Sequence, residues 1–250
     1  MTTLTGIYYN TMNIPCFENK LLPAKRFFEN GMRLIPVFLL PLILFVSCQK
    51  ADKSYYRDGQ PKFIIPKDSR GKMDGEAKWW YENGSPMLTA EYKNGELNGK
   101  LARFYENGNK QTEDSYLQGR LNGLSLEMDL NGNVFSEKTY VNDTLNGISR
   151  QFNGIGQVTE EGNYKNGYFE GEWNYYDRFG NLIGKADFNR GSGIRKSWNA
   201  NGKTAMTTEY HDNLIHGSET WYDEFGQKIR VRTYISGEIV SERIILPGQQ

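Results

Sequence analysis

Few side chains in this sequence are of the types that bind metals or catalyse reactions. The two histidines, His211 and His216, occur together in the stretch YHDNLIHG and could ligate a metal ion as a pair. No third ligand type converges on them, so we interpret both as polar turn residues. The only cysteines, Cys16 and Cys48, are too few for a disulfide framework or a cysteine metal cage. We predict no bound metal and no cofactor.

Carboxylates are the other side chains that could do chemistry. Asp and Glu together number 30, and a glycosidase pair could be among them because acid–base carboxylates carry no local motif. Several carboxylates recur beside glycine turns, whereas a catalytic residue is needed only once, so we interpret them as solvated turn residues. The sequence has no phosphate-binding glycine loop and no serine elbow, and we predict no catalytic residue and no enzymatic activity. The recurring carboxylates are Glu82, Glu106, Asp177 and Asp223.

The composition describes a polar chain rich in turns and aromatic rings. It has 27 glycines, 14% aromatic residues and a mean hydropathy of -0.68, which favours a β repeat over a compact enzyme. Thirty basic side chains balance 30 acidic ones without a run of like charge. We therefore expect neither a nucleic-acid partner nor a polybasic membrane contact.

An apolar stretch lies close to the N-terminus. Met32 and Arg33 precede residues 34–47, which are uncharged and mostly apolar. Fourteen residues are too few for a membrane span, which needs about 20, but they suit the apolar region of a secretory signal. We predict a signal peptide at 32–47. We interpret residues 1–31 as a non-native or disordered N-terminal extension, because a long polar leader does not fit a signal-peptide design.

The residues Phe45-Val46-Ser47-Cys48 resemble the lipobox of bacterial lipoproteins, although that motif usually has leucine in place of Phe45. The resemblance implies that Cys48 is lipidated, becomes the mature N-terminus and anchors the protein in the bacterial cell envelope, at the outer membrane. The alternative is an ordinary signal or a short anchor followed by an incidental cysteine.

Glycines divide the rest of the chain into seven repeats. From Gly75 an anchor glycine recurs every 24 residues to Gly171, and after a two-residue deletion it continues at Gly193 and Gly217. A second glycine follows each anchor by nine residues. These turn glycines are Gly84, Gly108, Gly132, Gly156, Gly180, Gly202 and Gly226.

Two turn signals in each repeat leave segments of strand length between them. Asn-Gly pairs predict type I′ turns, in which both central residues have positive φ. Each repeat is then one β-hairpin, and we predict an all-β fold: an elongated, single-layer antiparallel meander, twisted or curved because long sheets do not stay flat. The pairs are Asn83-Gly84, Asn94-Gly95, Asn107-Gly108, Asn131-Gly132, Asn166-Gly167 and Asn201-Gly202.

A column of aromatic residues lies 17 residues after the anchors. Two-residue turns would place Tyr92 opposite Gly75 and Leu97, so that the ring covers exposed glycine backbone. The same arithmetic places Tyr116 opposite Gly99 and Leu121, and Tyr164 opposite Gly147 and Phe169. We predict a structural role for this column, which consists of Tyr92, Tyr116, Tyr140, Tyr164, Phe188, Tyr210 and Tyr234.

A second column lies five residues after the anchors, and Met128 is its one non-aromatic member. We expect it on the opposite face of the sheet if no bulge intervenes, with Trp80 opposite Met87. One interpretation is that the rings stack on one another in place of a core, and the other is that they form a binding surface. The candidate binding residues are Trp80, Phe104, Phe152, Tyr176, Trp198 and Tyr222.

The repeat, and especially YKNGYFEGEWNYYDRFG from Tyr164 to Gly180, resembles MORN repeats in their 24-residue bacterial variant, found in YwqK-type antitoxin components of toxin–antitoxin modules. The resemblance covers residues 75–240, with a degenerate copy from Tyr55. It implies a scaffold that binds proteins or associates with lipids. If the antitoxin description applies, the target is an exported or surface toxin, because a lipobox does not suit a cytoplasmic antitoxin.

The repeat is irregular in a few places. Residues 150–156 loosen one turn, Asp143 and Asn213 replace glycine, and residues 188–194 absorb the deletion, so we expect a bend or a partner site there. We divide the mature chain into a linker with a degenerate repeat (48–74), seven repeats (75–240) and a tail (241–250) that caps the last strand.

Two functions remain open. The first is a non-catalytic, membrane-anchored scaffold that binds an unidentified protein, either a toxin or an envelope component. The alternative is a carbohydrate-binding or cell-wall-binding module that uses its aromatic ladder.

Overall fold

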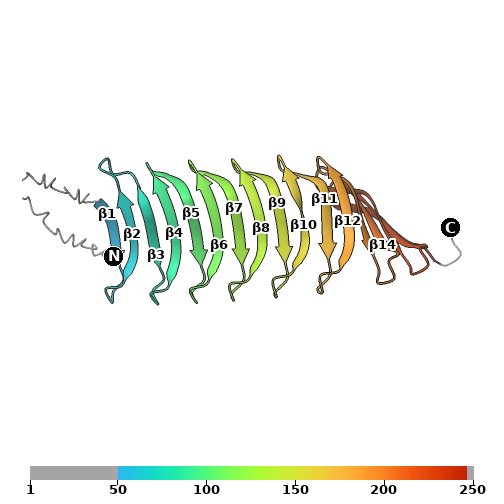
Figure 1. Cartoon of the computed structure of the whole chain (residues 1–250), viewed down its shortest axis with the longest axis horizontal. Helices are drawn as coiled ribbons and strands as arrows, with labels where there is room; N and C mark the ends of the chain where they lie inside the picture. Colours follow the sequence, from blue (N-terminus) through green and yellow to red (C-terminus); the bar gives the residue numbers. More distant parts are fainter. Residues whose placement is uncertain (1–49, 247–250) are drawn as a thin grey trace, which may run out of the picture. The chain divides into compact units, whose positions relative to one another are not determined.

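The computed structural model describes residues 50–246, which form one sheet of 17 antiparallel strands (Figure 1). The predicted signal peptide at 32–47 and the predicted lipidation site, Cys48, lie outside the described residues. No helix in residues 50–246 is long and apolar enough to cross a membrane. The strands are β1 (Lys50–Tyr55), β2 (Pro61–Lys67), β3 (Gly75–Trp80), β4 (Pro86–Lys93), β5 (Glu96–Phe104), β6 (Lys110–Leu117), β7 (Arg120–Met128), β8 (Val134–Val141), β9 (Thr144–Phe152), β10 (Val158–Lys165), β11 (Tyr168–Tyr176), β12 (Leu182–Asn189), β13 (Ser192–Trp198), β14 (Thr204–His211), β15 (Leu214–Tyr222), β16 (Lys228–Ile235) and β17 (Glu238–Ile244).

Each strand pairs with the strands that precede and follow it in the sequence. The sheet is therefore an open meander, and it forms a ribbon that is longer across its strands than along them (Figure 1). The all-β antiparallel meander of hairpin repeats that the glycine spacing predicts is confirmed. Residues 50–67, expected as a linker with a degenerate repeat, supply β1 and β2 of this same sheet.

The two long edges of the ribbon have different turns. Along the I′ edge (turns centred at 94–95, 118–119, 142–143, 166–167, 190–191, 212–213 and 236–237), both central residues have positive φ, as in Asn94 (53°) and Gly95 (93°). These are type I′ turns, as predicted. Each turn also donates a backbone N–H to the preceding hairpin, for example from Gly119 to the carbonyl of Leu97 at 2.8 Å. Successive turns are thereby tied together.

Along the opposite, wide-turn edge (56–60, 81–85, 105–109, 129–133, 153–157, 177–181, 199–203 and 223–227), the type I′ prediction is wrong. Gly84 has positive φ but Asn83 does not, and the N–H of Gly84 donates to the carbonyl of Tyr81 at 3.0 Å. This is a three-residue turn closed by one left-handed glycine. The longer turn shifts the register, so Trp80 pairs with Pro86 and not with Met87.

The tyrosine register that the two-residue turns predict is confirmed. Tyr92 pairs with Gly75 on one side and with Leu97 on the other, and Tyr116 and Tyr164 repeat the pattern. Next to each pair the receiving strand carries a two-residue bulge, which holds Gly99 at φ 125° on β5. The anchor glycine is needed for this backbone geometry, and a Cβ added at Gly99 would also meet the side chain of Glu91.

The two aromatic columns lie on opposite faces, as predicted. We call the side that carries Gly75 and Tyr92 face A, and the side that carries Trp80 face B. Trp80 and Gly75 are an odd number of residues apart on β3, so their side chains alternate to opposite sides. Contacts agree, because the Tyr176 hydroxyl donates to Glu161 of face B at 2.8 Å. The bulges add two residues each and so preserve the alternation.

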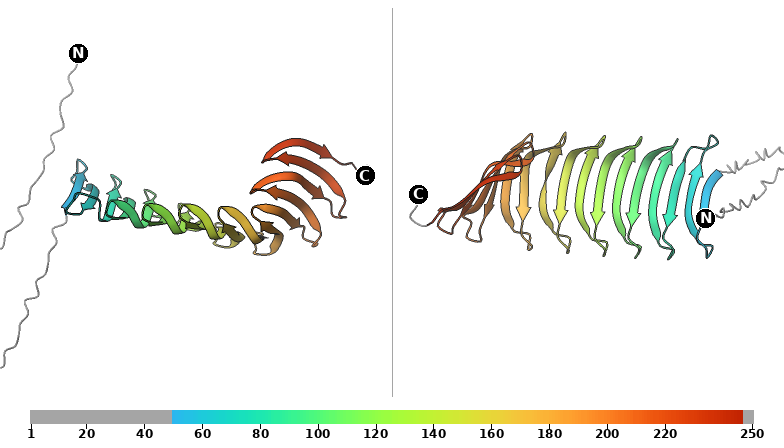
Figure 2. Two further views of the ribbon diagram at one scale, coloured as in Figure 1. Left: turned by 90° about the horizontal axis from the view of Figure 1, so that it is seen from above. Right: turned by 180° about the vertical axis from the view of Figure 1, so that it is seen from behind.

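The two-residue deletion removes one bulge and coincides with a change in the direction of the sheet. β12 and β13 pair without interruption from Gly184 opposite Ser197 to Asn189 opposite Ser192. In Figure 2 the strands from β12 onward turn away from the plane of the preceding ribbon. The buried core lies here on face A, and it consists of Trp173, Tyr175, Ala186 and Phe188, packed against Tyr164, Phe169 and Tyr210.

The first residues of the predicted tail at 241–250 belong to the last strand of the sheet, and residues 247–250 lie outside the described part of the chain. Residues Ser241–Ile244 continue β17, which pairs with β16 on one side and with no other strand of residues 50–246. Ile245 extends this pairing through a hydrogen bond from its N–H to the carbonyl of Ile229 at 2.9 Å. The outer edge of the sheet within the described residues is therefore an ordinary strand.

Candidate functional site

The predicted binding column does not form a stacked ladder. Its members occur on every second strand of face B, so neighbouring rings are about 9.6 Å apart and cannot stack. Among the phenylalanine, tyrosine and tryptophan rings of residues 50–246, the ring pairs in contact all lie on face A. Examples are Tyr164 with Phe169 (centroids 5.1 Å apart) and Phe188 with Tyr210 (5.4 Å). The interpretation in which the column stacks on itself as a core is therefore wrong.

Two members of the column, Trp198 and Tyr222, line adjacent hollows on face B at the wide-turn edge. We call the two hollows together the turn-edge groove. Both hollows include Gly202, which joins them. The first is lined by Asp177, Asn181, Leu182, Ile183, Trp198, Asn199, Ala200 and Gly202. The second is lined by Lys196, Gly202, Lys203, Thr204, Thr207, Tyr222 and Gly226.

Turn chemistry differs between the two ends of the wide-turn edge. The first turns begin with tyrosine, and each hydroxyl reaches the next hairpin, as in the hydrogen bond from Tyr81 to the carbonyl of Phe104 at 2.9 Å. At the groove the turns begin with Asp177, Asn199 and Asp223, whose side chains bond within their own turns. No tyrosine hydroxyl is recorded crossing between these turns within the described residues.

The carboxylate of Asp177 is occupied by its own turn. It accepts the N–H groups of Phe179 and Asn181 at 2.8 and 2.9 Å and the side-chain amide of Asn181 at 3.0 Å. These hydrogen bonds, that of the Asn181 side chain foremost, hold the pKa of Asp177 below its ordinary value. Asp177 and Asp223 are turn residues, as the sequence pattern predicts.

Exposed apolar residues stand at the tips of the wide turns near the groove. Ile155, Phe179 and Phe225 are 76%, 68% and 73% exposed. Ile155 lies within residues 150–156, where the sequence predicts a bend or a partner site, whereas Phe179 and Phe225 were not predicted. Their signal is visible when the repeats are aligned, because all three stand where the other repeats have asparagine, as at Asn83 and Asn201.

The lysines that line the groove have no carboxylate partner within the described residues, unlike the lysine next to them. Lys185, the neighbouring lysine on face B, pairs with Glu172 at 3.0 Å. Lys196 and Lys203 of the second hollow have no ion pair within the part of the chain that the structure describes, and Lys203 donates only to the carbonyl of Glu224 at 2.8 Å. Lys228, also without an ion pair there, is the cross-strand neighbour of Tyr222. The groove therefore combines apolar lining with available positive charge.

The four remaining members of the predicted binding column lie outside the groove. Trp80, Phe104 and Phe152 are half-buried on face B at earlier hairpins, and the Tyr176 hydroxyl is engaged by Glu161. The structure thus brings Trp198 and Tyr222 together at one site and disperses the rest.

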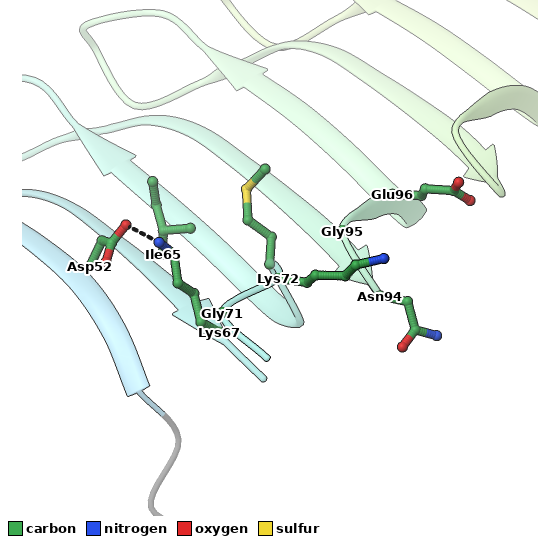
Figure 3. Close-up of a pocket in the computed structure, with 9 residues that line it drawn as sticks. Asp52, Ile65, Lys67, Gly71, Lys72, Asn94, Gly95 and Glu96 are labelled. Atoms are coloured by element: carbon green, nitrogen blue, oxygen red, sulfur yellow. Dashed lines mark ion pairs between the residues drawn. The ribbon is translucent and has the colours of Figure 1, made fainter. Parts of the chain in front are cut away.

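A separate hollow lies near the N-terminal end of the sheet (Figure 3). An ion pair between Asp52 and Lys67 spans it, and Lys72 and Glu96 bring one further charge of each sign. Because its opposite charges compensate one another and its rim has no exposed aromatic tip, it offers less to a ligand than the turn-edge groove.

The histidines flank the I′ turn at 212–213. Nδ1 of His211 is 3.1 Å from the Ser192 hydroxyl, and Nδ1 of His216 accepts the N–H of Ser236 at 3.2 Å. Their rings are 5.7 Å apart. Within residues 50–246, no group of three histidine, cysteine, aspartate or glutamate side chains is arranged to hold a metal ion.

Comparison with known families identifies a repeat model within the sheet. Residues 73–94 match the family model described as MORN repeat variant. This segment corresponds to the β3–β4 hairpin with its wide turn, which is one structural unit of the sheet. No curated protein matches the chain.

Proposed function

We propose that this chain, in which residues 73–94 match the MORN repeat variant, is a non-catalytic repeat module that binds a protein partner in its turn-edge groove. MORN repeats are generally modules that bind proteins or membranes. The observation that carries the proposal is the pair of adjoining hollows that contain Trp198 and Tyr222, beside the exposed tips Phe179 and Phe225.

The character of the groove favours a protein ligand. Protein interfaces combine a central apolar pocket, aromatic residues and a polar rim, and a few such residues provide most of the binding energy. Leu182, Ile183 and Trp198 supply the apolar part, and Lys196 and Lys203 supply the rim. The carbohydrate alternative has less support, because the ring column offers separate platforms about 9.6 Å apart in place of a continuous ladder.

The sequence adds a location to this proposal. Residues 32–47 have the features of a signal peptide and Cys48 follows them in lipobox position, so the module would be lipid-anchored in the bacterial cell envelope. Its partner would then be an exported or surface protein, and a toxin if the antitoxin-like description applies. Incorporation of labelled palmitate that disappears in Cys48→Ser tests the anchor, and palmitate that never enters the wild-type chain contradicts it.

A matched pair of tryptophans tests the binding proposal. Trp80 and Trp198 occupy the same column, but only Trp198 lines the groove. We expect Trp198→Ala to abolish capture of a partner from envelope extract by the full-length chain, while Trp80→Ala leaves capture intact. Thermal unfolding shows whether each variant is folded, and retention on peptidoglycan is measured in parallel. Equal effects of the two substitutions would contradict the assignment, and loss of glycan retention alone would support the carbohydrate alternative.

A further inference from the structure

We propose that the partner segment in the turn-edge groove carries an apolar side chain next to a carboxylate: the apolar group enters the first hollow and the carboxylate binds Lys196 and Lys203 in the second. This inference rests on the proposed function and specifies the chemistry of the partner. Its basis is the division of the groove into two hollows of different character that meet at Gly202.

The first hollow suits an uncharged side chain. Leu182, Ile183, Trp198 and Ala200 give it apolar lining. Its one acidic residue, Asp177, is held by hydrogen bonds from its own turn. A ligand group that enters this hollow would bury apolar surface without leaving a charge unpaired.

The second hollow suits an anion. Lys196 and Lys203 line this hollow together with the hydroxyl groups of Thr204, Thr207 and Tyr222. All five side chains can donate hydrogen bonds. Hydrogen bonds from ammonium groups to a carboxylate are stronger than those between neutral groups. The hollow has no carboxylate of its own among its lining residues.

The positive charge at the groove is a local exception. Residues 73–250 contain 19 lysines and arginines against 25 aspartates and glutamates, so the body of the repeat array is acidic. Several lysines elsewhere on face B are paired, as Lys100 is with Glu113 at 3.2 Å and Lys185 with Glu172. An acidic ligand would therefore be drawn to this groove and repelled from the surface around it.

Gly202 makes the continuity of the two hollows testable. Its φ is 79°, and a Cβ added to it meets no atom within 4 Å, so a side chain there would project into open space between the hollows. Asparagine tolerates this backbone conformation. Gly202→Asn should therefore obstruct the groove without unfolding the chain. Gly108→Asn is the matched control. Gly108 occupies the same position in its own wide turn, with φ 88° and no atom within 4 Å of an added Cβ. It lies outside the groove, two wide turns before the predicted bend region.

The test is a selection of displayed random nine-residue peptides on the full-length chain, with counter-selection on Gly202→Asn. We expect the selected peptides to place a leucine, phenylalanine or tryptophan beside an aspartate or glutamate. Replacing that carboxylate with its amide should weaken binding at least 10-fold, and Lys196→Gln and Lys203→Gln should each weaken it several-fold, whereas Lys185→Gln and Gly108→Asn should not. Affinity should fall as salt rises.

The inference is overturned if the selected peptides have no carboxylate, if their amide forms bind equally well, or if no peptide depends on Gly202. It is also overturned if vesicles of phosphatidylethanolamine and phosphatidylglycerol bind through Lys196 and Lys203 and peptides do not. If Trp198→Ala still abolishes partner capture in any of these cases, the proposed function stands and only the partner chemistry is wrong. If Trp198→Ala has no effect on capture, the proposed function itself fails.

Discussion

At the scale of single residues, the sheet depends on small groups that lie beneath rings. Trp173 is 1% exposed although the sheet has a single layer, because its ring lies over Gly162 of the neighbouring strand. A Cβ at position 162 would be 2.1 Å from the ring. This glycine has no positive φ, so its role is to provide space and not an unusual backbone conformation.

Gly162→Ala should therefore destabilise the protein by roughly 1–3 kcal/mol, the usual effect of overpacking a core. The measurement is the urea midpoint of unfolding. Gly154→Ala is the control, because Gly154 has neither positive φ nor an atom within 4 Å of an added Cβ, and we expect it to shift stability by less than about 0.5 kcal/mol. Equal midpoints for the two variants would contradict the packing described here.

Glu160 lies on face A near the same core, and its carboxyl group should make the stability of the fold depend on pH. Burial raises its pKa, and the nearby Arg195 offsets part of the increase. The folded state therefore favours the protonated form, so this stabilising contribution is complete below the pKa of the unfolded chain and is lost as pH rises through the folded pKa. Glu160→Gln should be more stable than the wild type at pH 7, and the difference should shrink towards pH 4.

Glu172 provides a control of opposite sign. Hydrogen bonds from Lys185, and next from Asn174, lower its pKa. Its contribution to stability is present above the unfolded pKa and is lost as pH falls, so Glu172→Gln should lower stability at pH 7 and have less effect near pH 4. Urea unfolding of both variants at the two pH values tests the signs, and a shift in the same direction for both would contradict this account.

At the scale of elements, the bulges set the path of the sheet. The deletion lies between Gly191 and Gly193, where the other repeats have three residues in place of one. The β12–β13 pair has no bulge, and here the sheet changes direction (Figure 2). The shortened turn also brings Asn213 to the backbone two turns earlier, where it accepts the N–H of Phe169 at 2.8 Å and donates to the carbonyl of Gly167 at 2.7 Å.

Inserting Leu-Asn after Ser192 restores the spacing of the earlier repeats. We expect the bulge to return, the Asn213 hydrogen bonds to be lost and the ribbon to straighten, because the bend no longer has its local cause. Small-angle X-ray scattering should then give a larger maximum dimension than the wild type. An equal insertion in the wide turn after Asn107 is the control, and unchanged scattering from the Ser192 variant would show that the bend has another origin.

At the scale of the whole molecule, much of the fold follows from residue spacing. The type I′ turn at 94–95 fixes the pairing of Tyr92 with Leu97, as arithmetic predicts. Across the wide turn, the register shift beside Trp80 restores the predicted pairing of Tyr92 with Gly75. The wide turns themselves are not predictable in this way, because Asn-Gly also suits a turn in which glycine alone has positive φ, and the pairing of Trp80 was therefore misplaced. The six-residue binding column was predicted as a set, but only Trp198 and Tyr222 reach the groove.

The groove itself was beyond sequence reasoning for a physical reason. It forms where consecutive wide turns close on themselves and no tyrosine hydroxyl links them, and this depends on contacts between hairpins as well as on the residues of any one repeat. The apolar tips Phe179 and Phe225 could have been found by comparing the repeats at the asparagine position. Their relation to Trp198 required the structure.

The central claim is that a protein partner occupies the turn-edge groove, and site-specific photocrosslinking tests it most directly. A photoreactive amino acid at Ala200 lies in the first hollow, and the same amino acid at Glu106 occupies the equivalent turn position outside the groove. In cells, we predict that the Ala200 probe forms an adduct with one protein, that Trp198→Ala removes the adduct, and that the Glu106 probe forms none. Equal adducts from both positions, or an Ala200 adduct that persists in Trp198→Ala, would contradict the account.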